Sequence, residues 1–79
     1  MDIKIYTTPG CFYCEQMKEL CKRAEVEYES EEIENEVLNA RYPNAKSYPY
    51  VIIDGEEIGG IVEAAKYFIK KGLVSARKD

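Results

Sequence analysis

The sequence predicts an α/β protein with a four-stranded mixed sheet, built in the order strand, helix, strand, helix, strand, strand, helix and flanked by three helices. A helical pattern between two alternating segments has the length that a parallel crossover needs. A continuous apolar run is followed by an Asp-Gly turn, which is typical of a hairpin. A last helical pattern follows a Gly-Gly pair. Together these observations place helices on a mixed sheet.

The first strand, the first helix and the second strand form the predicted crossover. Residues 3–6 alternate apolar and polar side chains and end at the turn-forming residues 7–10. From residue 11 to residue 24, apolar side chains recur at three- and four-residue steps, as on one face of a helix against a sheet. This stripe consists of Tyr13, Cys14, Met17, Leu20, Cys21 and Ala24. Residues 26–29 alternate again, which predicts a second strand parallel to the first.

A short second helix and a hairpin are predicted next. A weaker helical pattern over residues 33–42 ends at Pro43. The apolar run Tyr50–Ile53 predicts a central strand that is buried on both faces. Asp54-Gly55 suits a type I′ turn, since both central positions of that turn need a positive φ, and residues 56–58 return as the fourth strand.

The final helix begins after Gly59-Gly60 and ends at Gly72. Its apolar positions are Ile61, Ala65, Phe68 and Ile69. We expect residues 1–79 to form a single domain, because the chain has about half the length of a typical domain. Residues 75–79 are polar and terminal, so we expect them to fray.

Composition and charge exclude several classes of function. Eleven Lys and Arg against 15 Asp and Glu give a net charge of −4, which argues against a sequence-independent nucleic-acid binder. No apolar run approaches the roughly 18 residues of a membrane span, and the amino terminus lacks the pattern of a secretory signal. We therefore expect a cytoplasmic monomer that binds neither nucleic acid nor membrane. Seven glutamates over residues 25–36 form either a solvated face or an electrostatic docking surface.

The use of cysteine indicates thiol chemistry. The chain has three cysteines, so a fully paired disulfide scaffold is impossible, and it has no histidine. Cys11 and Cys14 form a C-x-x-C motif where the first strand turns into the first helix. The unpaired N–H groups and the dipole of a helix start stabilise a thiolate at Cys11. Cys14 lies one turn further on, within reach of Cys11 for a disulfide, and its burial keeps it a protonated thiol.

The alternative interpretation of a C-x-x-C motif is half of a zinc site. A closed zinc site needs four Cys or His ligands, whereas this chain has three cysteines and no histidine. Cys21 lies two turns after Cys14 in the apolar stripe, and we interpret it as a core residue. We therefore expect no metal site.

Two further segments complete a candidate site. Pro49 can begin the central strand because its missing N–H need not enter the ladder. We expect the Tyr48–Pro49 peptide to be cis, with the N–H and C=O of Tyr48 facing an extended thiol substrate, and an ordinary trans loop is the alternative. The N–H groups at Gly59-Gly60 either hold a carboxylate or belong to a simple turn.

The chain resembles the glutaredoxins over nearly its whole length. The matching segments are Y-T-T-P-G-C-F-Y-C at residues 6–14, Y-P-Y-V-I-I-D-G at residues 48–55 and I-G-G at residues 58–60. They are similar to the family's C-P-Y-C, its T-V-P before a strand and its Gly-Gly pair before the last helix. Three ordered motifs at the right separations are more specific than C-x-x-C alone. The resemblance implies a thioredoxin fold.

The resemblance also implies glutathione-linked disulfide chemistry. Cys11 would be the nucleophile and Cys14 the resolving thiol, with glutathione as the reducing co-substrate and no other cofactor. Disulfide-containing proteins would be the partners. The residues implied in substrate binding are Thr8, Tyr13, Tyr48, Pro49, Gly60, Ile61, Val62 and Glu63.

The chain departs from the family pattern around this site. Phe12 replaces the proline of C-P-Y-C, and Thr8 stands where many members have a lysine that meets a glutathione carboxylate. Val62 contributes only its backbone, whereas Glu63 can still meet the glutathione ammonium. The candidate substitute cations, by charge and position, are Arg41 and Lys46.

Three functions are compatible with these residues, and we favour the first. It is a dithiol glutaredoxin that reduces protein disulfides and glutathione mixed disulfides. The second is an electron donor, for example to ribonucleotide reductase, that a flavoprotein reductase re-reduces, and the acidic residues 25–36 would fit it. The third is an iron–sulfur carrier in which two chains each provide Cys11 and a bound glutathione, an interpretation that Phe12 keeps open. A pure binding module would leave Cys11 at a helix start unexplained.

Overall fold

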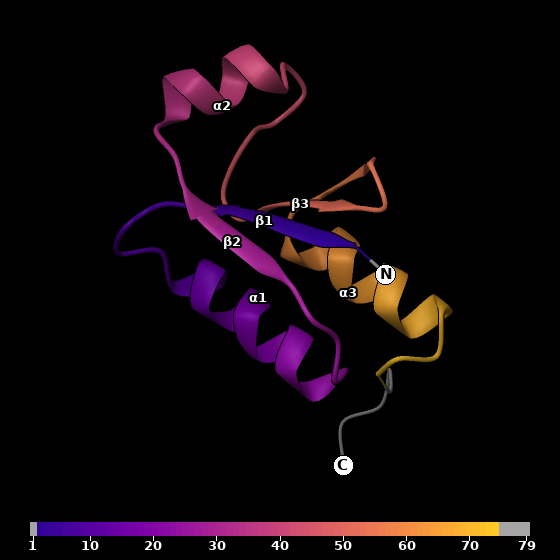
Figure 1. The fold of residues 1–79 in the computed structure, drawn as a ribbon. Coiled ribbons are helices and arrows are strands. Elements are labelled where there is room, and N and C mark those ends of the chain that lie inside the picture. Colours follow the sequence, from indigo (N-terminus) through magenta and orange to yellow (C-terminus); the bar gives the residue numbers. More distant parts are fainter. Residues whose placement is uncertain (1, 75–79) are drawn as a thin grey trace.

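The computed structural model describes residues 2–74 and has the element order that the sequence predicts (Figure 1). The strands lie in the order β2-β1-β3-β4, with β1 and β2 parallel and the other pairs antiparallel. The fraying predicted for residues 75–79 lies outside the described residues. The strands are β1 (Ile3–Thr7), β2 (Glu29–Glu32), β3 (Tyr50–Ile53) and β4 (Glu56–Gly59). The helices are α1 (Phe12–Arg23), α2 (Asn35–Arg41) and α3 (Ile61–Lys70).

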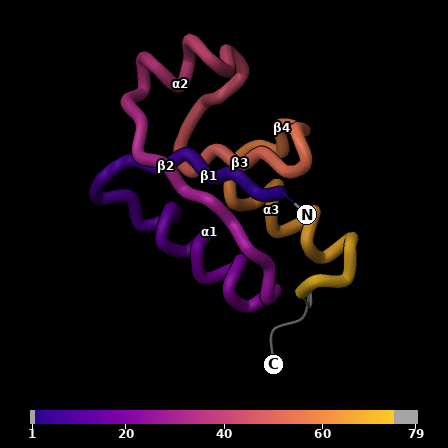
Figure 2. Tube along the Cα trace, viewed as in Figure 1, coloured from indigo at the N-terminus to yellow at the C-terminus, as the bar shows by residue number. Residues whose placement is uncertain are grey.

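The sheet separates two packing layers. Helices α1 and α3 cover one face, and α2 lies on the other (Figures 1 and 2). Val51 and Ile53 of β3 pack in the layer of α1 and α3. Tyr50 and Ile52 pack in the layer of α2. All four residues are buried, so the prediction of a central strand buried on both faces is confirmed.

The second strand begins three residues later than the sequence predicts. The prediction of a strand over residues 26–29 is wrong, because β2 begins at Glu29. After α1, Glu25 adopts a positive φ of 57° and the Val26 N–H donates back to the last turn of the helix, so the chain is still turning there. Val26 and Tyr28 pack against the core from this connection, which accounts for their alternation with polar residues.

Pairing with β1 accommodates the acidic sequence of β2. The Nζ atom of Lys4 lies 3.7 Å from a carboxylate oxygen of Glu29 and 3.0 Å from one of Glu31. The hydrogen bond with Glu31 raises the pKa of Lys4. The single ammonium of Lys4 on β1 therefore lies close to two carboxylates of the edge strand β2.

The remaining elements differ from the predictions in detail. Asp54 and Gly55 have φ values of 52° and 81°, as a type I′ turn requires, so this prediction is confirmed. Placing Tyr13 in the buried stripe is wrong: it is 58% exposed, because the first turn of α1 follows the loop beyond the end of β1. In α3, Ala64 and Phe68 are the buried positions. None of the helices within residues 2–74 is long and apolar enough to span a membrane.

Cys21 lies in the core, as predicted, with an exposed fraction of 0%. Burial raises the pKa of its thiol to about 11. The folded protein thus keeps a proton that the unfolded chain releases from about pH 8.5 upward. This contribution of Cys21 to stability is fully present below that pH and is lost as the pH rises toward the folded pKa.

We expect the free energy of unfolding of the reduced protein to fall between about pH 8.5 and 11, by roughly 2–3 kcal/mol for this thiol. Chemical denaturation at a series of pH values measures it in the wild type and in Cys21→Ala. The variant should begin less stable, because it leaves a cavity, but should lose less stability over this range. Cys14 and Tyr50 titrate in both proteins, so parallel pH dependences would contradict the raised pKa of Cys21.

Candidate active site

The sheet register brings three segments to one end of the sheet. Strands β1 and β3 are antiparallel with Tyr6 opposite Tyr50, so Thr7 and the loop after it lie beside Pro49. Strands β1 and β2 are parallel with Thr7 opposite Glu32, which brings Glu32 to the same end. The peptide bond that precedes Pro49 is cis, as predicted, and the Pro49 side chain is fully buried. The start of α1 follows directly from this cluster of loops.

Cys11 is the N-cap residue of α1, as expected for a cysteine at the helix start. Its backbone is extended, with φ −92° and ψ 113°, and its Sγ accepts a hydrogen bond from the Cys14 N–H at 3.1 Å. A Ser, Thr, Asp or Asn oxygen usually has this role. The Cys11 sulfur thus faces the N–H groups at the start of the helix. The Cys11 side chain is also partly exposed, so an incoming disulfide can reach it.

Cys14 lies in a different environment from Cys11. Its exposed fraction is 2%. Burial, and then the hydrogen bond with Cys11, raise the pKa of the Cys14 thiol to about 12. The Thr8 backbone amide and the Lys18 ammonium act in the opposite direction. Cys14 therefore keeps its proton at neutral pH.

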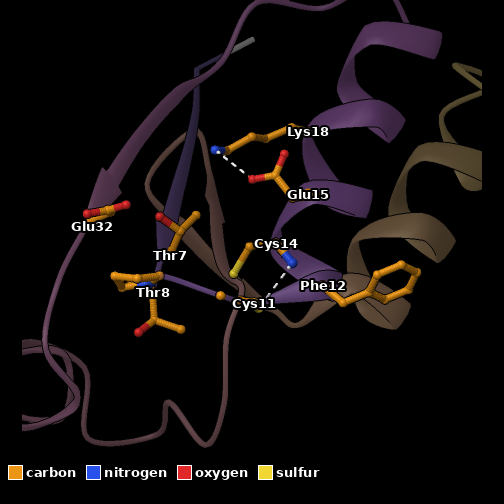
Figure 3. A pocket seen from close by; sticks show the side chains of 10 residues that line it. Thr7, Thr8, Cys11, Phe12, Cys14, Glu15, Lys18 and Glu32 are labelled. Atoms are coloured by element: carbon orange, nitrogen blue, oxygen red, sulfur yellow. Dashed lines mark hydrogen bonds and ion pairs between the residues drawn. The ribbon is translucent and has the colours of Figure 1, made fainter.

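A hollow of about 320 Å³ opens beside the two cysteines (Figure 3). Its walls are the loop between β1 and α1, the first turns of α1 and the end of β2. The Nζ atom of Lys18 forms an ion pair with a Glu15 carboxylate oxygen at 3.4 Å in this hollow. The structure brings Thr8 together with the cysteine pair, as expected. The lining residues with polar or sulfur-containing side chains are Thr7, Thr8, Cys11, Cys14, Glu15, Lys18 and Glu32.

Two aromatic side chains are exposed next to the cysteine pair. Phe12 is 68% and Tyr13 58% exposed, and their rings meet edge-on with centroids 5.4 Å apart. Figure 3 shows the Phe12 ring extending away from Thr7 and Thr8, on the other side of Cys11. Phe12 and Tyr13 thus provide an apolar surface beside Cys11.

A second hollow of about 350 Å³ lies between the loop before β3, the end of β4 and the start of α3. It brings Gly60 and Glu63 together with Lys46, whereas Arg41 does not line it. Its other lining residues are Asn44, Ser47, Tyr50, Ile58 and Gly59. Within residues 2–74, no group of three or more His, Cys, Asp or Glu side chains is arranged to hold a metal ion.

Glu63 closes over the start of α3. Its Oε1 accepts a hydrogen bond from the Gly60 N–H at 3.1 Å, and its side chain lies over Gly59. The Gly60 N–H that the sequence offers to a ligand carboxylate is therefore already paired with a carboxylate of the chain. The N–H groups of Ile61 and Val62 are the next donors of this helix start, and Val62 is 58% exposed.

Tyr48 is held by its side chain, which leaves its backbone at the end of the sheet. The Tyr48 hydroxyl donates a hydrogen bond to the Ile33 carbonyl at 2.5 Å. Its peptide groups immediately precede Pro49 and β3.

Sequence reasoning missed two residues of the first hollow, Lys18 and Glu32. Lys18 had a local signal, because it follows Cys14 by four residues and so shares its helix face. Glu32 had none. It enters the site through the parallel pairing of β1 with β2, and the sequence predicted that this strand spans residues 26–29, which do not include Glu32.

Comparisons with known proteins agree with this geometry. A family model described as Glutaredoxin matches residues 3–58. The chain is 38% identical over 66 residues to Glutaredoxin 1 of Rickettsia bellii (strain RML369-C), covering 73% of this chain and 67% of that protein. It is similar to the crystal structure of a thioredoxin-like protein, with 32% identity, a TM-score of 0.67 and coverage of 82% of this chain and 96% of the other. The buckwheat glutaredoxin-glutathione complex matches with 22% identity, a TM-score of 0.75 and coverage of 90% and 71%, which shows the fold.

A cysteine pair at a helix start beside this mixed sheet defines a thiol–disulfide oxidoreductase with the thioredoxin fold. The family model covers most of the chain, and the Rickettsia relative agrees with it. The chain belongs to the glutaredoxin family, as the sequence resemblance implied, and is an enzyme of thiol–disulfide exchange.

We expect iodoacetamide to modify Cys11 and to spare Cys14 and Cys21 in the folded, reduced protein at about pH 7.5, because only a thiolate that solvent reaches is alkylated rapidly. Peptide mass spectrometry after a timed reaction identifies the modified residue. The denatured protein is the control, and all three cysteines should react in it. Equal labelling of Cys11 and Cys14 in the folded protein would contradict the raised pKa of Cys14.

Proposed function

We propose that this protein is a dithiol glutaredoxin that reduces protein disulfides and glutathione mixed disulfides, with glutathione as its reducing co-substrate. The observation that carries the proposal is the arrangement of the two thiols. Cys11 caps α1 with its sulfur and reaches solvent, while Cys14 lies buried one turn further on and keeps its proton. Only Cys11 is therefore ready to attack a disulfide.

The proposed mechanism has two exchange steps. The Cys11 thiolate attacks one sulfur of the substrate disulfide, the substrate S–S bond breaks, and the leaving thiolate takes a proton from solvent. The product is a mixed disulfide at Cys11. When Cys14 attacks the Cys11 sulfur, Cys14 loses its proton, the reduced product leaves and a Cys11–Cys14 disulfide remains. Two glutathione molecules reduce that disulfide and become glutathione disulfide. When the mixed disulfide is between Cys11 and glutathione, a glutathione thiolate can instead attack the bound glutathione sulfur, which releases glutathione disulfide and restores Cys11.

The second hollow supports glutathione as the co-substrate. Glutathione carries two carboxylates and one ammonium, and this hollow offers Lys46 for a carboxylate and Glu63 for the ammonium. The N–H groups of Ile61 and Val62 provide a further position for a carboxylate at the start of α3. The backbone of Tyr48, which precedes Pro49 and β3, is the segment that we propose pairs with the tripeptide. The fold shared with the buckwheat glutaredoxin-glutathione complex is consistent with this mode of binding.

A second candidate function is electron donation after re-reduction by a flavoprotein, for example to ribonucleotide reductase. The acidic edge strand β2, Glu29–Glu32, favours it, because an exposed acidic edge suits a docking partner with basic residues. The likeness to a thioredoxin-like protein points the same way.

Turnover on a glutathione mixed disulfide, with glutathione and its reductase, tests the first function. A parallel assay coupled to thioredoxin reductase tests the second. The cytoplasmic location and the monomeric state remain predictions.

We expect Cys11→Ser to abolish thiol transfer on every substrate, because it removes the sulfur that caps the helix. Cys14→Ser should keep activity on glutathione mixed disulfides, where glutathione completes the cycle, and should lose the reduction of protein disulfides. The two coupled assays measure both. Cys21→Ser serves as the control and should stay within a few-fold of wild type. Equal losses in the Cys11 and Cys14 variants on both substrates would contradict the assigned roles.

We expect Lys46→Gln to raise the KM for glutathione by roughly two- to fivefold with little change in kcat, because an exposed ion pair contributes about 0–1 kcal/mol. Steady-state kinetics at low and high salt measure the change, which should shrink as salt increases. Arg41→Gln is the matched control, since it removes the same charge from outside the hollow. If both variants changed KM equally, a general effect of net charge would replace the specific contact.

A further inference from the structure

Cys14, the proposed resolving thiol, has a raised pKa that opposes its reaction as a nucleophile. Cys14 must lose its proton before it can attack, yet its burial opposes the charged form. The chain has no histidine that could serve as a general base. Another group must therefore stabilise negative charge on the Cys14 sulfur.

Lys18 lies where it can provide that stabilisation. It follows Cys14 by four residues on α1, so the two side chains share one face of the helix. Figure 3 shows Lys18 projecting from α1 into the hollow that also contains both cysteines. Among the residues that line this hollow, Lys18 is the only cation. Its side chain is 29% exposed, so much of its length lies against the protein.

Glu15 does not cancel this charge. The ion pair between Lys18 and Glu15 is 3.4 Å long, but the Glu15 side chain is 71% exposed and is screened by water. The cation is thus the more buried member of the pair. In agreement with this asymmetry, Lys18 lowers the pKa of Cys14 and thereby opposes the effect of burial.

We propose that Lys18 is a positioning residue for the resolving step, in which its ammonium stabilises the negative charge on the Cys14 sulfur as Cys14 attacks the mixed disulfide at Cys11. The proposal rests on the proposed function, which assigns Cys14 as the resolving thiol. In this step Cys14 gives its proton to solvent, and its sulfur forms a bond to the Cys11 sulfur. The bond between Cys11 and the substrate sulfur breaks, and the substrate thiolate leaves with the electron pair and takes a proton from solvent.

Two other groups shift the pKa of Cys14, and Cys14 in turn acts on a third group, Tyr48. The hydrogen bond and the charge of Cys11 oppose ionisation of Cys14, and the Thr8 backbone amide favours it. Burial, and then the charge of Cys14, raise the pKa of Tyr48. All three groups remain in place when Lys18 is substituted, so a change in the resolving rate reports on the lysine.

The test uses the full chain in its reduced form and one equivalent of the aromatic disulfide dithionitrobenzoate, followed by stopped-flow absorbance. The first coloured thiolate is released when Cys11 attacks the reagent. The second is released when Cys14 attacks the mixed disulfide. Cys14→Ser should show only the first phase, which assigns the two phases to the two thiols.

We expect Lys18→Met to slow the second phase by about three- to tenfold and to leave the first within about twofold. A first phase at the wild-type rate, together with an unchanged far-UV circular dichroism spectrum, shows that the variant is folded. The second phase should accelerate with pH in both proteins, and the variant should need a higher pH to reach the same rate. Lys18→Arg should restore most of the rate, because it restores the charge.

Lys22→Met is the matched control. Lys22 forms an equivalent pair with Glu19 at 3.7 Å, one turn further along the same helix, and does not line the hollow. This variant should change neither phase. An unchanged second phase in Lys18→Met, equal slowing of both phases, or an arginine variant as slow as the methionine variant would overturn the proposal. The assay contains no glutathione, so its outcome is independent of whether glutathione is the physiological reductant.

Discussion

The capping of α1 by the Cys11 sulfur is the interaction on which the rest of the site depends. A helix start leaves several N–H groups without partners, and here a sulfur accepts one of them instead of the usual oxygen. The position of that sulfur follows from β1, which ends at Thr7, and from the loop that leads into the helix, where Gly10 has a φ of 74°. In the proposed function, the same sulfur atom both begins a helix and attacks a disulfide.

The same helix places the second thiol in the opposite environment. Cys14 follows Cys11 by three residues, which carries the chain from a partly exposed cap to the buried face of α1. One thiol therefore faces incoming disulfides, whereas the other can act only on a disulfide formed beside it. In the proposed function, the difference in burial therefore makes Cys11 attack first and Cys14 second. Lys18 is proposed to accelerate the second attack.

The two hollows of the site contain different chemical groups. The first hollow contains the reacting sulfurs, and the second contains the charges that suit a small zwitterionic peptide. In the second hollow, the Glu63 carboxylate already accepts the hydrogen bond of the Gly60 N–H. A ligand carboxylate at this helix start must use the following N–H groups or displace Glu63, which leaves Lys46 as the side chain that suits a ligand carboxylate there.

The sequence by itself determined the element order, the central strand, the Asp54-Gly55 turn and the placement of the cysteine pair at a helix start. Each of these depends on local periodicity or on the φ values that a few adjacent residues can adopt. Only the tertiary structure decided that β2 begins at Glu29, that Glu32 shares a hollow with the cysteines, and that Lys46 lines the second hollow. These features depend on strand register and on packing between segments far apart in the chain, and no short-range pattern encodes such contacts.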